Sequence, residues 1–281
     1  MKLCRYGKPG YEKPGMIDGE GKLRDLSKVI DSIGPNELSP RGLKMLSKVK
    51  PDSLPLVNGN PRFGVPYVGI GKFVAIGLNY SDHAREAGMA IPTEPIVFMK
   101  ATTCINGPSD DIVQPRNSTK LDWELELGVV IGSQAKYVSE AAALSHVAGY
   151  CIVNDVSERA FQMATTQWDK GKGFDTAGPI GPWLVTTDEI ADPQNLDMAL
   201  DLNGKRMQTG NTRTMIFGVA KIVSHVSQYM TLLPGDVIAT GTPPGVGLGI
   251  KPTPLFLKPG DQLRLTIQGL GEQRQRIVAY E

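Results

Sequence analysis

One segment specifies a buried, acidic β-strand: Asp122-Trp123-Glu124-Leu125-Glu126-Leu127-Gly128-Val129-Val130-Ile131. In a strand, alternation puts Glu124 and Glu126 on one face and Leu125 and Leu127 on the other. Apolar residues follow at once, so we expect this strand to lie in a core. Two carboxylates on one strand face repel each other unless a cation lies between them. Because oxygen ligands suit hard divalent cations, the pair indicates a magnesium, manganese or calcium site; a solvated strand face is the alternative.

The composition excludes several classes of partner. The chain has 281 residues with 30 Lys+Arg against 29 Asp+Glu, a formal net charge of +1, so we expect neither nucleic acid nor an anionic membrane as a partner. With 32 glycines, 21 prolines and 6% aromatic residues, it favours a turn-rich β architecture. Three cysteines without metal-ligand spacing indicate reduced thiols. Since no signal peptide or long apolar run stands out, we expect a soluble cytoplasmic protein.

Prolines and glycines before residue 67 indicate a boundary, so we expect a small N-terminal domain at 1–66 and a main domain at 67–281. In the first, a hairpin turn at 18–21 and a helix near 43–49 are predicted. Ser81 is predicted as the N-cap, and Gly88 as the terminator, of one helix. The elements expected in the main domain are strands at 73–77, 96–99, 125–131, 149–153, 183–185 and 198–202, and helices at 81–87, 140–146, 157–164 and 218–230. This pattern predicts a β-rich α+β fold with peripheral helices.

A third carboxylate, that of Asp155, follows the strand predicted to end at Asn154. The run Asp155-Val156-Ser157-Glu158 also fits a helix capping box, which is the local alternative. Combined with the two glutamates, Asp155 would complete a three-carboxylate cation site. The three carboxylates carry a charge of −3 and a divalent cation carries +2, so a further cation such as a lysine can lie nearby.

His83 and Glu86 are three residues apart on one predicted helical turn, so the carboxylate can orient the imidazole and raise its basicity. That pairing suits a base that activates water. Lys172 lies between two glycines, which suggests a loop whose backbone approaches something closely and whose lysine holds a carboxylate or an enolate oxygen. The alternatives are an exposed helix with an incidental histidine and a surface lysine in a flexible loop.

The loop at 239–247, rich in glycine, proline and threonine, offers free backbone N–H groups but lacks the ending of a P-loop. An anion-binding nest and a plain turn fit its spacing equally. The signatures of serine hydrolases, zinc proteases and nicotinamide enzymes do not occur in the chain.

Five ordered motifs resemble the fumarylacetoacetate hydrolase family over roughly residues 70–281. They are Asn79-Tyr80-Ser81-Asp82-His83, Trp123-Glu124-Leu125-Glu126-Leu127, Asn154-Asp155-Val156-Ser157, Lys172-Gly173-Phe174-Asp175 and Thr240-Gly241-Thr242-Pro243. The N-terminal stretch resembles the small added domain of bacterial members. It is most similar to that of the 2,4-diketo-3-deoxy-L-fuconate and L-rhamnonate hydrolases, a set often labelled ureidoglycolate lyase.

The resemblance implies a mixed β-sandwich roll, a homodimer and a bound Mg²⁺ or Mn²⁺. It implies site roles for eight residues: metal ligands Glu124, Glu126 and Asp155, catalytic residues His83, Glu86 and Lys172, and substrate-binding residues Gln162 and Thr242. It also implies a mobile lid at about 83–95. The further metal-binding aspartate that larger eukaryotic members take from an N-terminal segment has no counterpart in this sequence.

Together these features predict hydrolysis of the C3–C4 bond of a 2,4-dioxo acid, with a sugar acid giving pyruvate and a hydroxy acid such as lactate. In this hypothesis His83 activates water, and Lys172 helps the cation to stabilise a pyruvate enolate. The alternatives are oxaloacetate decarboxylation, isomerisation of an oxo acid, and a non-catalytic β domain with a structural cation.

Overall fold

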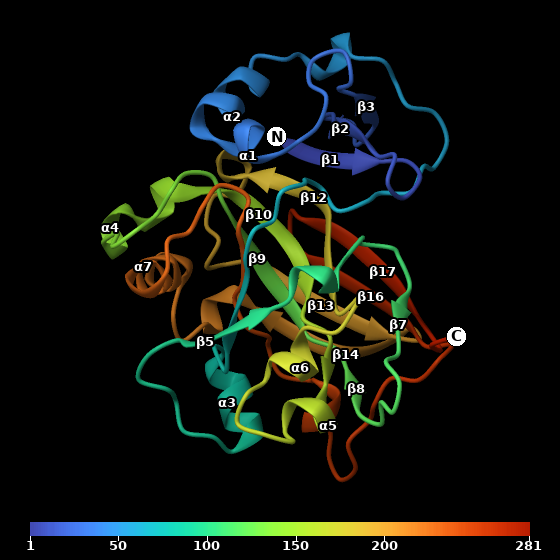
Figure 1. Ribbon diagram of the computed structural model, residues 1–281, viewed down its shortest axis with the longest axis vertical. Helices are drawn as coiled ribbons and strands as arrows, with labels where there is room; N and C mark the ends of the chain where they lie inside the picture. Colours follow the sequence, from blue (N-terminus) through green and yellow to red (C-terminus); the bar gives the residue numbers. More distant parts are fainter.

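The computed structural model describes residues 1–281, and its strands form two main sheets (Figure 1). The larger, ten-stranded sheet has the order β3-β2-β1-β12-β10-β9-β15-β4-β5, with β6 paired to β12. Its strands are β1 (Lys2–Tyr6), β2 (Lys13–Ile17), β3 (Leu23–Asp25), β4 (Phe73–Gly77), β5 (Ile96–Lys100), β6 (Ile105–Asn106), β9 (Leu125–Ile131), β10 (Val147–Asn154), β12 (Gly178–Thr186) and β15 (Val237–Ala239). Every residue of β9 is buried, so the predicted core position of this strand is confirmed.

The smaller sheet has five strands in the order β14-β13-β16-β17-β7. They are β7 (Ile112–Val113), β13 (Asp197–Leu202), β14 (Lys205–Asn211), β16 (Gln262–Ile267) and β17 (Gly271–Val278), and a separate two-stranded ribbon joins β8 (Leu121–Asp122) to β11 (Ser157–Glu158). Leu200 and Leu265 of the smaller sheet belong to the same apolar core as Val129 and Ile152 of the larger one. Most neighbouring strands are antiparallel, but β4 and β15 run parallel. The predicted β-rich α+β class with mixed sheets is therefore confirmed.

Seven α-helices lie around the sheets (Figure 1). They are α1 (Pro35–Leu38), α2 (Pro40–Leu46), α3 (Ser81–Ala87), α4 (Glu140–Ala143), α5 (Arg159–Gln162), α6 (Asp169–Lys172) and α7 (Val219–Tyr229). None of them has both the length and the apolar character needed to cross a membrane.

Several local predictions are confirmed and others are wrong. The turn at 18–21 joins the antiparallel strands β2 and β3, and Gly88 ends α3 in the left-handed conformation with φ +66°. Ser81 is not the N-cap of α3, since that position is held by Tyr80 and the Ser81 hydroxyl donates to Thr214 O at 3.2 Å. The helix predicted near 43–49 lies earlier, at Pro40–Leu46.

The helix predicted at 157–164 is also wrong, because β11 occupies its first two residues and α5 covers only Arg159–Gln162. Its N-cap is Glu158, which accepts a hydrogen bond from Phe161 N at 2.8 Å, so Asp155 does not cap a helix. The helix predicted at 140–146 divides into α4 and a 3-10 turn at Leu144–His146. Short polar residues after a strand can either cap a helix or continue as extended chain. Here the pairing of β11 with β8 selects the extended chain.

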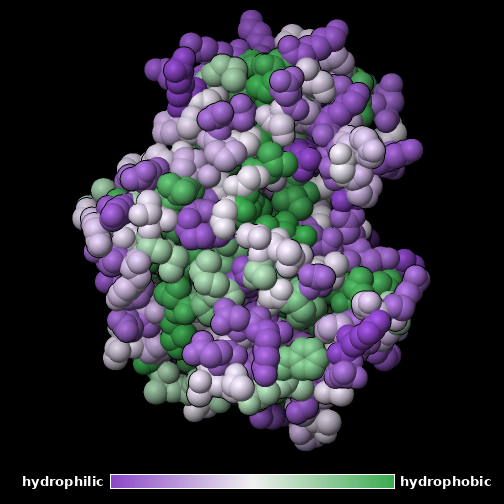
Figure 2. Space-filling view, viewed as in Figure 1, coloured by the Kyte–Doolittle hydropathy of each residue, from purple (hydrophilic) through white to green (hydrophobic).

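The N-terminal strands extend the larger sheet, because β1 pairs with β12. Glu12 bridges two arginines of this segment, Arg5 at 3.1 Å and Arg62 at 2.9 Å. A cleft of about 810 Å³ opens between this segment and the rest of the chain, and the rings of Phe63 and Trp183 meet edge-to-face on its wall, 6.0 Å apart. Figure 2 shows hydrophobic residues gathered at the waist below the N-terminal segment. The division at residue 66 stays a prediction.

Candidate active site

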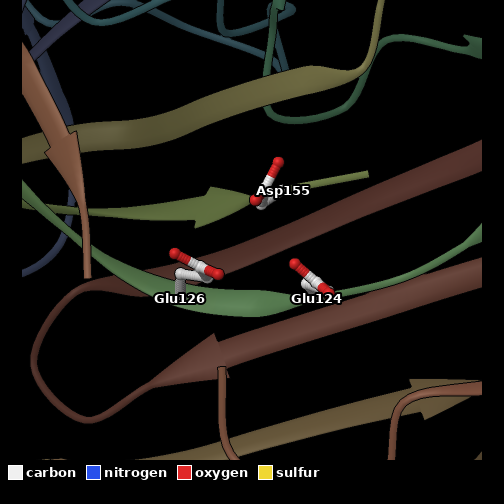
Figure 3. A group of neighbouring side chains, drawn as sticks. All are labelled: Glu124, Glu126 and Asp155. Atoms are coloured by element: carbon white, nitrogen blue, oxygen red, sulfur yellow. The ribbon is translucent and has the colours of Figure 1, made fainter. Parts of the chain in front are cut away.

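Three acidic side chains meet where β9 begins and β10 ends (Figure 3). Glu124 directly precedes β9 and Glu126 lies within it, so both side chains project from the same face. Asp155 follows the last residue of β10, and its backbone N–H donates to Glu124 O at 2.9 Å. Carboxylate oxygens of the three residues lie within 4.8 Å of one another, and the residues are only 6%, 2% and 0% exposed. The antiparallel pairing of β9 with β10 thus assembles the predicted ligand set.

Three buried cations surround this acidic group. Lys172 Nζ donates to Glu124 Oε2 at 2.6 Å and to Asp155 Oδ2 at 2.7 Å. Arg159 Nη2 donates to the other oxygen of Glu124, Oε1, at 2.6 Å. Lys100 Nζ lies 2.6 Å from Asp155 Oδ1, in an ion pair that lacks hydrogen-bond geometry. Each of these contacts is charge-assisted and shielded from water, which makes it stronger than an exposed pair.

Lys172 reaches the carboxylates from the end of α6, not from the flexible loop considered in the sequence. α6 packs closely on α5, and Gly171 permits this approach, because a Cβ on Gly171 would lie 2.4 Å from Gln162 N. The close backbone approach predicted from the glycines is therefore confirmed. Lys172, which follows Gly171, is buried, and its side chain faces the acidic group.

The cations give neighbouring carboxylates opposite pKa shifts. Burial opposes ionisation of Glu124, but the charges of Arg159 and Lys172 outweigh it and lower its pKa to about 2. Burial raises the pKa of Glu126 well above its ordinary value, and the charges of Asp155 and Glu124 add to the effect. Burial opposes the charge on Lys172 too, yet Asp155 and Glu124 raise its pKa. In the metal-free site the neighbouring cations therefore favour the charged form of Glu124, whereas burial disfavours the charged form of Glu126.

The donor set suits a hard divalent cation. Glu126 has no lysine or arginine partner, and its Oε2 accepts only the backbone N–H of Gly241, at 2.7 Å. Asp155 Oδ1 is buried and accepts no hydrogen bond, although Lys100 Nζ lies 2.6 Å away. A buried carboxylate without a cationic partner, as at Glu126, is costly unless a cation coordinates it. An all-oxygen set of this kind fits Mg²⁺ or Mn²⁺, and Glu124, Glu126 and Asp155 would hold the ion.

His83 and Glu86 form the predicted pair on α3. His83 Nδ1 lies 3.0 Å from Glu86 Oε2, and Glu86 Oε1 accepts the backbone N–H of Gly245 at 3.1 Å. When Nδ1 carries the proton that Glu86 accepts, the lone pair of His83 Nε2 is free. Glu86 thus fixes both the tautomer and the orientation of the imidazole, as a water-activating base requires.

The loop after β15 directs its backbone N–H groups at the protein's own carboxylates. Gly241 N donates to Glu126, while Gly247 N and Leu248 N donate to the two oxygens of Asp122 at 2.7 and 3.0 Å. Gly241 has φ +95°, a conformation that favours glycine. The successive N–H groups of Gly247 and Leu248, at the end of this loop, converge on one carboxylate as in a nest, and Asp122 occupies it. Binding of an external anion by the loop stays a prediction.

A cavity of about 570 Å³ connects these groups. All the predicted site residues except Asp155 line it: His83, Glu86, Glu124, Glu126, Gln162, Lys172 and Thr242. Gln162 Oε1 accepts from Arg159 Nη1 at 3.1 Å. The Thr242 hydroxyl donates to Leu125 O and accepts from Gln208 Nε2, at 2.9 and 2.8 Å. Since that hydroxyl is already paired, the backbone N–H of Thr242 is its freer donor toward a ligand.

Three residues of this site were missed by sequence reasoning: Lys100, Asp122 and Arg159. Arg159 joins two carboxylates, because its Nε donates to Asp122 Oδ2 at 2.9 Å while Nη2 binds Glu124. A charged residue closing an apolar strand was the available signal for Lys100, and an arginine beside the third carboxylate was the signal for Arg159. Arg116 is exposed and lies over the Tyr280 ring, outside this cavity.

Comparisons with known proteins define the family of the chain. Residues 72–278 match the family described as fumarylacetoacetate (FAA) hydrolase C-terminal. A Burkholderia cenocepacia protein that carries only the general name hydrolase is 60% identical over 276 residues, 98% of each chain. The solved fumarylacetoacetate hydrolase of Exiguobacterium antarcticum is similar over 100% of both chains, with TM-score 0.90 and 36% identity. A 2-hydroxyhepta-2,4-diene-1,7-dioate isomerase from Mycobacterium marinum has TM-score 0.76 and 33% identity over 99% of this chain and 98% of its own. The chain belongs to the fumarylacetoacetate hydrolase family.

Proposed function

We propose that this protein is a divalent-cation-dependent hydrolase that cleaves the C3–C4 bond of a 2,4-dioxo acid and releases pyruvate. One observation carries the proposal: a single cavity holds both a buried carboxylate group that fits a cation and a carboxylate-oriented histidine. A structural cation site would need only the first of these. Bond cleavage by water needs both, because one end must accept the enolate charge and the other must take a proton.

The chain's own residues supply most of the steps. His83 Nε2 takes a proton from water as the water oxygen adds to the C4 carbonyl carbon. The C3–C4 bond then breaks, its electron pair passes to C3 as a pyruvate enolate, and the other fragment leaves as a carboxylic acid. C3 regains a proton from the imidazolium of His83, which restores the base.

The cations gathered at the acidic end of the cavity bind and neutralise the pyruvate half. When bound there, a divalent cation supplies Lewis-acid polarisation of the 2-oxo acid. Lys172 and Arg159 offset negative charge as the enolate forms, and the backbone N–H of Thr242 and the Gln162 amide orient the substrate. The cation's identity, Mg²⁺ or Mn²⁺, is part of this proposal, since both accept these ligands.

The test is pyruvate release coupled to lactate dehydrogenase, with Mn²⁺ and with EDTA. The substrates are an acylpyruvate, oxaloacetate and a 2,4-diketo-3-deoxy sugar acid. We expect cation-dependent release from a 2,4-dioxo acid. Fastest release from oxaloacetate would assign a decarboxylase instead, and no release from any substrate would overturn the hydrolase.

Isomerisation of an oxo acid is the second candidate, favoured by the likeness to the Mycobacterium marinum isomerase. An isomerase needs the same enolate chemistry but breaks no carbon–carbon bond. Ultraviolet spectra of a hydroxydienedioate incubated with enzyme separate the two, since isomerisation changes the absorbance without yielding pyruvate.

Two further expectations stand as proposals: that residues 1–66 form a distinct small domain and that the active form is a homodimer. Both rest on the resemblance to bacterial family members. Light scattering after size exclusion measures the second directly.

A further inference from the structure

The residues that line the site cavity fall into a charged group, called its charged end below, and an apolar group, called its apolar end. Apart from Lys251, every charged residue on its wall belongs to the carboxylate–cation group or to the His83–Glu86 pair. The remaining wall is built largely from aliphatic, aromatic and methionine side chains. The pyruvate half of a 2,4-dioxo acid accounts for the charged end. The group attached to C4 must therefore lie against the apolar end.

Aromatic rings mark where the charged end stops. The Phe98 ring centroid lies 5.2 Å from Lys172 Nζ, so one face of this ring meets the cation. Phe98 also meets Trp168 edge-to-face, with ring centroids 5.3 Å apart. Trp168 packs on the backbone of Gly77, where a Cβ would lie 2.7 Å from the indole ring. This wall is consequently fixed in place by packing and carries an apolar surface into the cavity.

Two methionines line the outer part of the same cavity and stand open to solvent. Met89 follows α3 and is 55% exposed, and Met163 follows α5 and is 61% exposed. Exposed apolar side chains at a cavity mouth mark surface that a ligand covers. Methionine adapts its shape to such a ligand because its chain is unbranched and flexible.

Hydrogen-bonding partners for a polar tail are scarce there. The Thr242 hydroxyl is paired on both sides within the protein. Gln162 Oε1 accepts from Arg159, which leaves the Gln162 Nε2 group, proposed above to orient the substrate, as a donor on this wall. A hydroxyl buried without a partner opposes binding. The C5 hydroxyl of a deoxy-sugar acid would meet this wall. Lys251 lies on the rim with an exposed side chain, so it does not make the interior polar.

We propose that the group carried on C4 is an apolar acyl chain of several carbons, and that Phe98, Trp168, Met89 and Met163 determine this specificity. The proposal rests on the hydrolase function above. It assigns the substrate class to acylpyruvates with an alkyl or aryl tail, in place of the hydroxylated sugar acids that the N-terminal resemblance suggested.

The first experiment compares acetylpyruvate, hexanoylpyruvate and 2,4-diketo-3-deoxyfuconate with Mn²⁺, by pyruvate release. Each buried methylene is worth about three- to fourfold in kcat/KM. Hexanoylpyruvate has four more methylenes than acetylpyruvate, so with all four buried it should exceed acetylpyruvate by about 80- to 250-fold. It should exceed the sugar acid as well. Equal values for the two acylpyruvates, or the highest value for the sugar acid, would overturn the proposal. So would a dioic acid turned over faster than hexanoylpyruvate, which would point to Lys251.

Variants of the mouth test the residues named. Met89→Gln with Met163→Gln keeps side-chain length while making the surface polar, and should reduce the hexanoyl-to-acetyl ratio by at least about fivefold. Met45→Gln is the matched control, since Met45 is a similarly exposed methionine on α2, outside the cavity. An unchanged ratio in the double variant would overturn the assignment of these residues.

A binding measurement separates failure of the tail assignment from failure of the hydrolase. Calorimetry with Mn²⁺ compares pyruvate with 2-oxooctanoate, which lacks a 4-oxo group and cannot be hydrolysed. Tighter binding of 2-oxooctanoate, lost in the double variant, supports the apolar tail even if no substrate yields pyruvate. If the protein releases pyruvate but neither kcat/KM nor binding depends on chain length, the proposed hydrolase function stands. The proposed specificity for an apolar tail is then overturned.

Discussion

Replacing Lys172 by methionine should destabilise the metal-free protein strongly. The side chain is 3% exposed, and its ammonium group is bound by two carboxylates, Glu124 and Asp155, at 2.6 and 2.7 Å. Methionine has a similar length and no charge, so the substitution removes the cation and leaves carboxylate charge less compensated. Breaking a buried ion pair in this way costs about 3–5 kcal/mol. For a chain of this size that lowers Tm by roughly 6–20 °C.

The assay is thermal unfolding in EDTA, with Lys170→Met as the control. Lys170 lies on the same short helix with its side chain in solvent, and its replacement should change stability by less than about 0.5 kcal/mol. A second arm adds Mn²⁺ at about 100 times its Kd, which stabilises the native protein by about 2.7 kcal/mol. In the Lys172 variant the ion also replaces the missing charge, so we expect a larger rise in Tm than in the native protein.

Two results would refute this reasoning. A Lys172 variant no less stable than the Lys170 control would show that the buried contacts contribute nothing net. Equal stabilisation of both proteins by Mn²⁺ would show that the lysine and the ion do not share the same carboxylates.

The remaining predictions concern the base, the loop and the N-terminal segment. Replacing His83 by Ala should lower kcat by about 10²–10⁴-fold and leave the Mn²⁺ Kd from calorimetry unchanged, whereas Glu126→Ala should abolish both binding and turnover. Asp122→Asn puts an amide N–H against backbone donors, so stability should fall by about 1–3 kcal/mol in denaturant unfolding. Burial opposes ionisation of Glu12, but the hydrogen bond from Arg62, a backbone hydrogen bond and the charges of Arg5 and Arg62 together outweigh it and hold its pKa below the usual 4.5. Glu12 thus stabilises the protein fully above that pH and loses this contribution as pH falls through the lowered pKa, so the Tm difference between the native protein and Glu12→Gln should shrink on acidification.

Each of these has a contrary outcome. Loss of Mn²⁺ binding in the His83 variant would assign that residue to the cation site. Unchanged stability on replacing Asp122 would mean that the loop is held elsewhere. A Tm difference at Glu12 that stays constant from neutral to acid pH would show that its charge is not what stabilises the segment.

The sequence was sufficient for elements whose cause is local. Alternation fixed Glu124 and Glu126 on one face of a strand, because side-chain direction in a strand depends only on position. The three-residue spacing of His83 and Glu86 likewise fixed their contact within one helical turn. Gly88 ended its helix where the pattern placed it, since a left-handed residue that ends a helix is usually glycine. For these features the tertiary structure added burial and exact distances.

Other features were decided only by the tertiary structure. Asp155 fits a capping box as well as a ligand set, and the pairing of β10 with β9 is what turns its carboxylate toward the glutamates. Lys100 and Arg159 carried no pattern of their own, because their partners lie in other strands. The cavity's apolar end likewise combines side chains from separate segments, including Phe98 and Trp168. The chain thus encodes its backbone locally, whereas the charge balance and the shape of the site exist only when distant segments pack together.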